Sequence, residues 1–225
     1  WMKQHEPENY DRLETILLPH DYINYWLTGE KKSEFGDASG TAYFDVRTRS
    51  WSKAILEAID DSGKLESCLP ELIPSEAPVG TIRSHIAERF QLPSDVLVSS
   101  GGGDNMMAAI GTGNVHPGII TMSLGTSGTI YAFADHPVVD PNGELAAFCS
   151  SSGGWLPLAC TMNVTVATEL TRAMLGLNLK ELNGKASSAP IGSEGIILLP
   201  YFNGERTPPL PNATASFLGL TSVNY

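Results

Sequence analysis

The chain has 225 residues, enough for one large domain or two smaller ones. Its formal net charge of −11 at pH 7 argues against binding to nucleic acid or to an anionic membrane surface, because both need clustered positive charge. No apolar run reaches the roughly 18 residues that cross a bilayer, and the chain opens on no signal-peptide pattern, so we expect a cytoplasmic protein. Cys68, Cys149 and Cys160 lack the spacing of a metal or redox motif, which favours thiols that simply pack in a reducing compartment.

The first sixty residues are predicted to be mainly helical. One helix begins at Pro19, which suits the first turn of a helix, and stops at Gly29. Its apolar residues fall on one face: Tyr22, Ile23, Trp26 and Leu27. Helical spacing predicts a second helix within residues 51–63, with Gly63 just past its end and apolar positions Trp51, Ala54, Ile55, Ala58 and Ile59. The segment between them, residues 38–49, is predicted to be loop or short strand.

A third helix and a short strand come before a run of glycines. Thr81 is the expected cap of that helix, which carries Ile82, Ile86 and Phe90. Residues 95–99 are a predicted strand that leads into Gly101-Gly102-Gly103-Asp104-Asn105. The chain is then expected to resume as a small-residue helix over residues 104–112.

The pattern changes near His116-Pro117-Gly118, where we place a domain boundary between residues 115 and 116. Two β-rich runs, 119–124 and 129–134, flank a Gly-Thr-Ser-Gly turn and predict a hairpin. A Ser/Gly-rich turn at 150–154, a helix at about 163–175 and a buried strand at 196–200 follow. The predicted fold class is α/β.

Asp104 stands where a strand ends and a helix begins. A helix N-terminus orients a carboxylate and favours its ionised form, and glycines let another molecule or another backbone approach closely. Asn105 adds a donor and an acceptor. Such an acid could orient a hydroxyl group and accept its proton. From this stretch alone, an ordinary helix cap beside a glycine hinge is the simpler interpretation.

Two further motifs follow. Residues 123–129, SLGTSGT, combine glycines and hydroxyls in a turn that could bind phosphate through backbone N–H groups, although a plain hairpin turn explains them equally well. The sequence contains neither a Walker A motif nor a nucleophile elbow at this turn. Residues 201–209, YFNGERTPP, are predicted to form a structural or interface loop with local pairing of Glu205 and Arg206.

In this order, the three motifs resemble those of the FGGY family of carbohydrate kinases, and most closely the xylulokinases among them. Other segments are similar to the family in family order: LLPHDYINYWLTGE (17–30), FGDASGTAYFDVRTRSWS (35–52) and YFNGERTPPLP (201–211). The resemblance covers nearly the whole chain.

The resemblance implies the actin-like ATPase (ribonuclease H-like) fold of two α/β domains, incomplete here at both ends. Residues 1–115 would be the C-terminal part of the sugar-binding domain, and residues 116–225 the N-terminal part of the nucleotide-binding domain. The implied activity is a phosphotransferase of xylose metabolism: with Mg²⁺, the γ-phosphoryl group of ATP passes to a sugar hydroxyl, O5 in D-xylulose. The implied partners are sugar and ATP, with a homodimer as a candidate assembly.

The resemblance also assigns roles to single residues. Asp104 matches the catalytic aspartate, which would act as the general base, and Asn105 matches a sugar contact. Gly125, Thr126 and Ser127 match the phosphate turn, and Asn163 is a weaker candidate on the nucleotide side. No residue is assigned to a metal.

Two family motifs do not occur in this sequence: the N-terminal Asp-x-Gly-Thr turn and the glycine-rich adenosine motif. We therefore expect the 225-residue chain by itself to be inactive or nearly so, and to expose sheet edges and apolar faces. Two alternatives stay open. One is a kinase for another polyol, such as L-ribulose, glycerol or gluconate. The other is an incomplete fragment that only binds sugar or assembles with another chain.

Overall fold

The computed structural model describes residues 1–224, which divide into two compact units of mixed helix and strand. Unit 1 comprises residues 1–120, 132–139 and 147–157, and unit 2 comprises residues 121–131, 140–146 and those from 158 onward. The predicted α/β class is confirmed. The predicted domain boundary between residues 115 and 116 stays a prediction.

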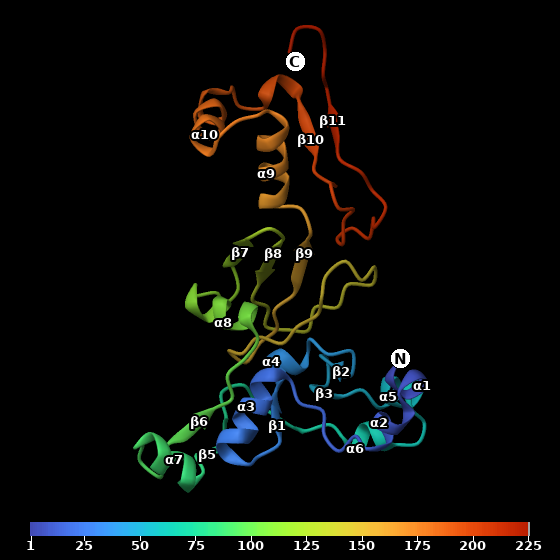
Figure 1. Ribbon diagram of the computed structural model, residues 1–225, viewed down its shortest axis with the longest axis vertical. Helices are drawn as coiled ribbons and strands as arrows, with labels where there is room; N and C mark the ends of the chain where they lie inside the picture. The colour runs from blue at the N-terminus through green and yellow to red at the C-terminus, as the bar shows by residue number, and fades with distance from the viewer. Residues whose placement is uncertain (225) are drawn as a thin grey trace. The chain divides into compact units, whose positions relative to one another are not determined.

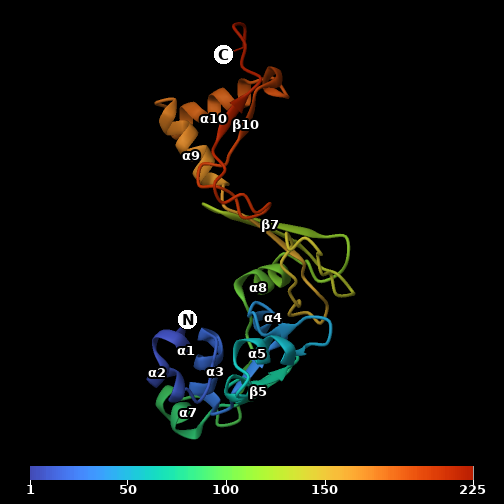
Figure 2. The same ribbon diagram turned by 90° about the vertical axis from the view of Figure 1, so that its right-hand side faces the viewer.

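Unit 1 contains short helices and three two-stranded sheets (Figures 1 and 2). Its helices are α1 (Met2–His5), α2 (Pro7–Asp11), α3 (Pro19–Thr28), α4 (Phe35–Ala38), α5 (Lys53–Ile59), α6 (Lys64–Ser67), α7 (Ser84–Phe90) and α8 (Asp104–Gly111). β1 (Lys32–Glu34) pairs in parallel with β4 (Glu71–Ile73). The antiparallel pairs are β2 (Phe44–Asp45) with β3 (Ser50–Trp51), and β5 (Pro78–Thr81) with β6 (Leu97–Ser99).

Unit 2 is built on a three-stranded sheet of order β7-β8-β9 (Figure 1). Its strands are β7 (Ile120–Leu124), β8 (Gly128–Ala132) and β9 (Leu158–Thr161), and the predicted hairpin at residues 119–134 is confirmed. α9 (Thr165–Met174) and α10 (Leu179–Ser188) follow, then the 3-10 turn η1 (Ser193–Gly195) and the antiparallel pair of β10 (Ile197–Leu199) and β11 (Ser216–Leu218). As expected, β7 is an edge strand with exposed apolar side chains: Ile120, Met122 and Leu124.

Helix α3 begins and ends where the sequence predicts, but the side that it buries is polar. Pro19 occupies its first turn, and Gly29 ends it in the left-handed region at φ 90°. The apolar face predicted from the spacing is largely exposed, with Tyr22 and Ile23 both more than half accessible. Asp21 and Asn24 are buried instead. Asn24 is satisfied by the carbonyl oxygen of Ser100 on another segment, and Asp21 forms an ion pair with its helix neighbour His20.

Two other helices begin later than predicted. Thr81 does not cap α7: it pairs with Leu97 in the β5–β6 sheet, and Arg83 is the residue before the first turn. Trp51 likewise pairs with Phe44 in a strand, so α5 starts at Lys53. In both cases the residue predicted to begin the helix pairs with a neighbouring strand instead.

The buried sides of α5 and β10 also differ from the sequence prediction. In α5, Leu56 is buried while Ile55 and Ile59 are exposed. The predicted strand at 196–200 exists as β10, but Ile197 is exposed because β10 pairs only with β11 in a two-stranded sheet.

One hydrophobic core cluster of unit 1 packs Ala38, Phe44 and Val46 against Cys149. Arg49 fastens the 150–155 loop to this core. Its guanidinium carbon lies 4.3 Å from the centroid of the Trp155 ring, and Nη2 donates to the carbonyl oxygen of Gly153 at 2.6 Å. This contact positions Ser151, which lies in the polar site described next.

Candidate functional site

Asp104 is the first residue of α8, as the sequence predicts, and it is exposed. Gly103 precedes the helix with an extended backbone, φ −63° and ψ 153°. The Asp104 Oδ1 atom accepts hydrogen bonds from the backbone N of Asn105 at 2.7 Å and from its Nδ2 at 3.1 Å. The carboxylate is therefore oriented by its neighbour and accessible to a ligand.

The glycine run before Asp104 lies against polar side chains. A Cβ added to Gly101 would lie 3.4 Å from His20 Cδ2, and Gly101 also has a positive φ of 74°. A Cβ on Gly102 would lie 2.9 Å from Ser151 Oγ, and one on Gly103 would lie 3.0 Å from Asp37 Oδ1. The positive φ favours glycine at position 101, whereas a Cβ at 102 or 103 would crowd neighbouring side chains, with Met107 Cε the nearest to Gly102 at 2.6 Å.

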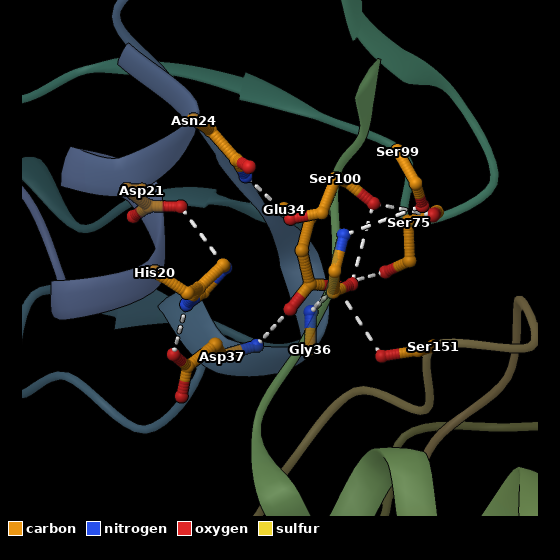
Figure 3. A network of polar contacts seen from close by, with 11 residues as sticks. His20, Asp21, Asn24, Glu34, Gly36, Asp37, Ser75, Ser99, Ser100 and Ser151 are labelled. Atoms are coloured by element: carbon orange, nitrogen blue, oxygen red, sulfur yellow. Dashed lines mark hydrogen bonds and ion pairs between the residues drawn. The ribbon is translucent and has the colours of Figure 1, made fainter. Parts of the chain in front are cut away.

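Glu34 is the centre of this polar network (Figure 3). It is 1% exposed and precedes the first turn of α4. Its Oε2 accepts from the Gly36 backbone N at 2.7 Å and from the hydroxyls of Ser75 and Ser151, while Oε1 accepts from the Asp37 backbone N. A buried carboxylate is tolerated only with such partners, so Glu34 ties three chain segments together, its own and those of Ser75 and Ser151.

His20 bridges two carboxylates. Its Nδ1 lies 2.9 Å from Asp37 Oδ2, and its Nε2 lies 3.1 Å from Asp21 Oδ1 in an ion pair that lacks the direction of a hydrogen bond. Asp21 and then Asp37 raise the pKa of His20 to about 10, against the opposing effect of burial. His20 therefore carries a positive charge at neutral pH.

The polar face of α3 completes the network. Asn24 Nδ2 donates to the carbonyl oxygen of Ser100 at 2.7 Å, and the Ser100 hydroxyl donates to the carbonyl oxygen of Ser75 at 2.7 Å. Ser100 comes directly before the glycine run, so α3 holds the segment that enters it.

Sequence reasoning missed most of this network, although the segments that carry it were recognised. No role was assigned to His20, Glu34 or Asp37. One signal was available: an acid just before the turn Phe-Gly-Asp is the pattern of a side chain that caps a helix start, which Glu34 does.

In unit 2, Gly125, Thr126 and Ser127 form the exposed turn between β7 and β8, as predicted. The turn is attached to the start of α9 by its carbonyl groups: Gly125 O accepts from the N and Oγ1 of Thr165 at 3.0 and 2.8 Å, and Thr126 O accepts from Val164 N at 3.1 Å. The Gly125 N–H donates to Ser127 O.

Asn163 directly precedes this attachment, but its side chain faces the loop at residues 201–206. It is buried, and its Nδ2 donates to Gly204 O at 2.6 Å and to Glu205 Oε2 at 3.2 Å. Glu205 also accepts from Thr161 Oγ1 and Met162 N, both at 2.7 Å. Burial alone would raise the pKa of Glu205, yet these hydrogen bonds outweigh it and hold the pKa at about 2.

The predicted pairing of Glu205 with Arg206 takes a different form. The Arg206 backbone N donates to Glu205 Oε1 at 2.7 Å, whereas its guanidinium Nη1 lies 3.8 Å from Cys160 Sγ. The structural role predicted for this loop agrees with these contacts.

The candidate residues thus form two sets. Asp104 and Asn105 contact each other in unit 1, while the 125–127 turn and Asn163 adjoin the start of α9 in unit 2. Within residues 1–224, no group of three or more His, Cys, Asp and Glu side chains is arranged to hold a metal ion. Over the same residues, no helix combines the length and the apolar character needed to cross a membrane.

Comparison with known proteins identifies a family that this chain matches. Residues 1–111 match the model of the FGGY family of carbohydrate kinases, N-terminal domain. The chain is 49% identical to the xylulose kinase of Haemophilus influenzae over 225 residues, which are 100% of this chain and 46% of that protein. The chain thus spans about half the length of the curated relatives that it matches.

Solved structures give the same result. A xylulose kinase from Bifidobacterium adolescentis superposes with a TM-score of 0.87 at 33% identity, covering 100% of this chain and 48% of that one. A gluconate kinase from Lactobacillus acidophilus gives a TM-score of 0.90 at 24% identity, covering 100% and 46%, which is likeness of fold alone. The predicted actin-like ATPase fold is confirmed by these neighbours.

Proposed function

Because the chain belongs to the FGGY family of carbohydrate kinases, we propose that the protein containing it transfers the γ-phosphoryl group of ATP to a ketose, D-xylulose before other sugars. The observation that carries this proposal is the 49% identity with a xylulose kinase across the entire chain. The product would be D-xylulose 5-phosphate. The fold does not identify the sugar substrate, since a gluconate kinase has a comparable backbone.

In this proposal Asp104 is the general base. The O5 hydroxyl of the sugar gives its proton to the Asp104 carboxylate as its oxygen bonds to the γ-phosphorus, and the bond between that phosphorus and the ADP oxygen breaks. The exposure of Asp104 and its place at the start of α8 support this role. Asn105, whose amide already touches Asp104, would bind the sugar beside it.

On the nucleotide side, we assign phosphate binding to Gly125, Thr126 and Ser127. Their exposure and the two hydroxyls favour this role. Asn163 is the weaker candidate, because Gly204 and Glu205 already engage its Nδ2, although its buried Oδ1 has no hydrogen-bond partner. Mg²⁺ neutralises phosphate charge in such reactions, and we assign none of the described residues to it.

The test is an ATP-consumption assay of the full-length protein on D-xylulose, L-ribulose, glycerol and gluconate. D-xylulose should give the highest kcat/KM, and Asp104→Asn should lower kcat by about 10²- to 10⁴-fold, the usual contribution of a general base. Asp95→Asn, at an exposed acid before β6, is the matched control and should leave kcat unchanged.

Other outcomes revise particular parts of the proposal. If the full-length protein prefers another polyol, the proposed mechanism stands and the proposed substrate is wrong. Full activity of Asp104→Asn would show that Asp104 is not the general base and serves only at the start of its helix. We also propose that the 225-residue chain alone lacks turnover, and robust sugar-dependent ATP consumption by that chain would contradict this.

A further inference from the structure

We propose that His20 and Asp37 are positioning residues for Asp104. Their side chains, joined in an ion pair, pack against Gly101 and Gly103 and so fix the backbone conformation at the start of α8. The inference rests on the proposed function, since it concerns the same carboxylate. Neither residue is assigned to contact the sugar or the nucleotide.

Asp37 lies between His20 and the glycine run. Asp37 presents one oxygen to each side: Oδ2 lies 2.9 Å from His20 Nδ1, and Oδ1 lies 3.0 Å from the point that a Cβ of Gly103 would occupy. Gly103 governs the start of the helix, because its carbonyl oxygen accepts the first-turn hydrogen bond from Met107 N at 3.0 Å. If Asp37 moves away, Gly103, the residue immediately before Asp104, therefore loses the side chain that packs against it.

The pair borders both ends of the glycine run. His20 Cδ2 lies 3.4 Å from the Cβ position of Gly101, and Asp37 borders Gly103. The middle glycine, Gly102, borders Ser151, whose hydroxyl donates to Glu34. Each of the three glycines thus has a member of the network within 3.4 Å of its Cβ position, and Met107 and Met106 of α8 also lie against Gly102 and Gly103.

His20 also places a positive charge among acidic side chains. The polar network against the glycine run contains three carboxylates: Asp21 from α3, Asp37 from α4, and Glu34 at the end of β1. The His20 imidazolium is the cation that contacts two of them. Without its charge, Asp21 and Asp37 would repel each other across the vacated site, and Asp37 would move from Gly103.

Placement of a catalytic group matters strongly, since an error of about 1 Å costs on the order of 10²-fold in rate. In the full-length protein, His20→Gln and Asp37→Asn should each lower kcat for the best sugar by about 10- to 100-fold. The KM for ATP should stay within about twofold, because neither residue is proposed to bind the nucleotide. His20→Lys, which keeps a positive charge, should recover most of the kcat that His20→Gln loses.

The chain offers a matched control in a second His–Asp pair. His136 Nδ1 lies 2.7 Å from Asp135 Oδ1, but both side chains are about three-quarters exposed. His136→Gln should leave kcat unchanged. Hydrogen exchange supplies a second readout: the backbone amide of Met107, which donates to Gly103 O, should exchange faster in His20→Gln than in wild type, while the amides of α5 should not.

Three results would overturn the inference. One is a kcat of His20→Gln within about twofold of wild type while Asp104→Asn is inactive, which leaves the proposed function standing. Another is equal loss in His20→Lys and His20→Gln, which would mean that charge is irrelevant. The third is unchanged exchange at the Met107 amide. This measurement tests the inference even if Asp104→Asn proves fully active and the proposed role of Asp104 fails.

Discussion

Glu34 and Ser151 are 117 positions apart in the chain, yet the Ser151 hydroxyl lies 3.4 Å from Glu34 Oε2 and donates to it. The same carboxylate accepts from Gly36, Asp37 and Ser75. Ser151 in turn borders Gly102, beside the proposed catalytic residue. A single buried acid therefore organises the segments on which the glycine run rests.

Replacing Glu34 by glutamine should destabilise unit 1 by about 2 to 3 kcal/mol, because an amide nitrogen cannot accept the hydrogen bonds that one carboxylate oxygen receives. Urea denaturation followed by circular dichroism would measure the loss. Glu71→Gln, at an exposed position on the paired strand β4, should change stability by less than about 0.5 kcal/mol. Equal stability of the two variants would show that Glu34 is dispensable.

Two glycine-to-alanine substitutions should act in opposite directions. A Cβ on Gly36 would lie 2.6 Å from Ser151 Oγ and 2.9 Å from Glu34 Oε2, so Gly36→Ala should disrupt the network and lower the melting temperature. Gly111, at the last position of α8, has nothing within 4 Å of its Cβ position. Gly111→Ala should therefore raise stability by about 0.5 to 1 kcal/mol. Calorimetry of both variants checks the pair, and a gain in Gly36→Ala would contradict it.

The sequence predicts those parts of unit 1 that depend on local signals. Pro19 and Gly29 delimit α3, and a glycine run followed by Asp104 marks the start of α8, because these residues act through their own backbone preferences. The side of α3 that is buried could not be predicted in this way. Its burial depends on Ser100, 76 positions from Asn24, and periodicity carries no information on partners so distant.

The same limit explains what sequence reasoning found at the site. Asp104 and the 125–127 turn were identified from motif resemblance, and both lie where the motifs suggest, one at a helix start and the other at a hairpin turn. His20 and Asp37 look like ordinary surface residues in sequence. Only folding brings them together.

The His20 pair should give stability a distinct dependence on pH. Asp21 and Asp37 raise the pKa of His20 to about 10 from its ordinary value near 6.5. The pair's contribution is therefore complete below pH 6.5 and is lost as the pH rises through 10. Wild type should exceed His20→Gln in urea midpoint at pH 6, by less at pH 8, and not at all above pH 10. A gap that is constant over this range would exclude titration of His20, and His136→Gln should follow wild type throughout.

Cys149 should be chemically inert in the folded protein. Burial raises the pKa of its thiol to about 11, so little thiolate exists at neutral pH. Alkylation with iodoacetamide at pH 8, followed by peptide mapping, should label the partly exposed Cys160 well before Cys149. Both should react alike in urea. Early labelling of Cys149 under native conditions would contradict the packing role expected for this thiol.

Glu205 should give unit 2 an acid-sensitive component of stability. Its pKa of about 2 lies below the ordinary value of 4.5, since hydrogen bonds from Met162, Arg206, Thr161 and Asn163 outweigh burial. The stabilisation is therefore present above pH 4.5 and disappears as the pH falls through 2. Glu205→Gln should cost about 2 kcal/mol at pH 7 and progressively less below pH 4.5. Glu169→Gln, which removes an exposed ion pair with Arg172, should cost less than about 1 kcal/mol. If the two variants lose equal stability at pH 7, the buried hydrogen bonds of Glu205 do not hold the 201–206 loop, and the structural role assigned to that loop must be abandoned.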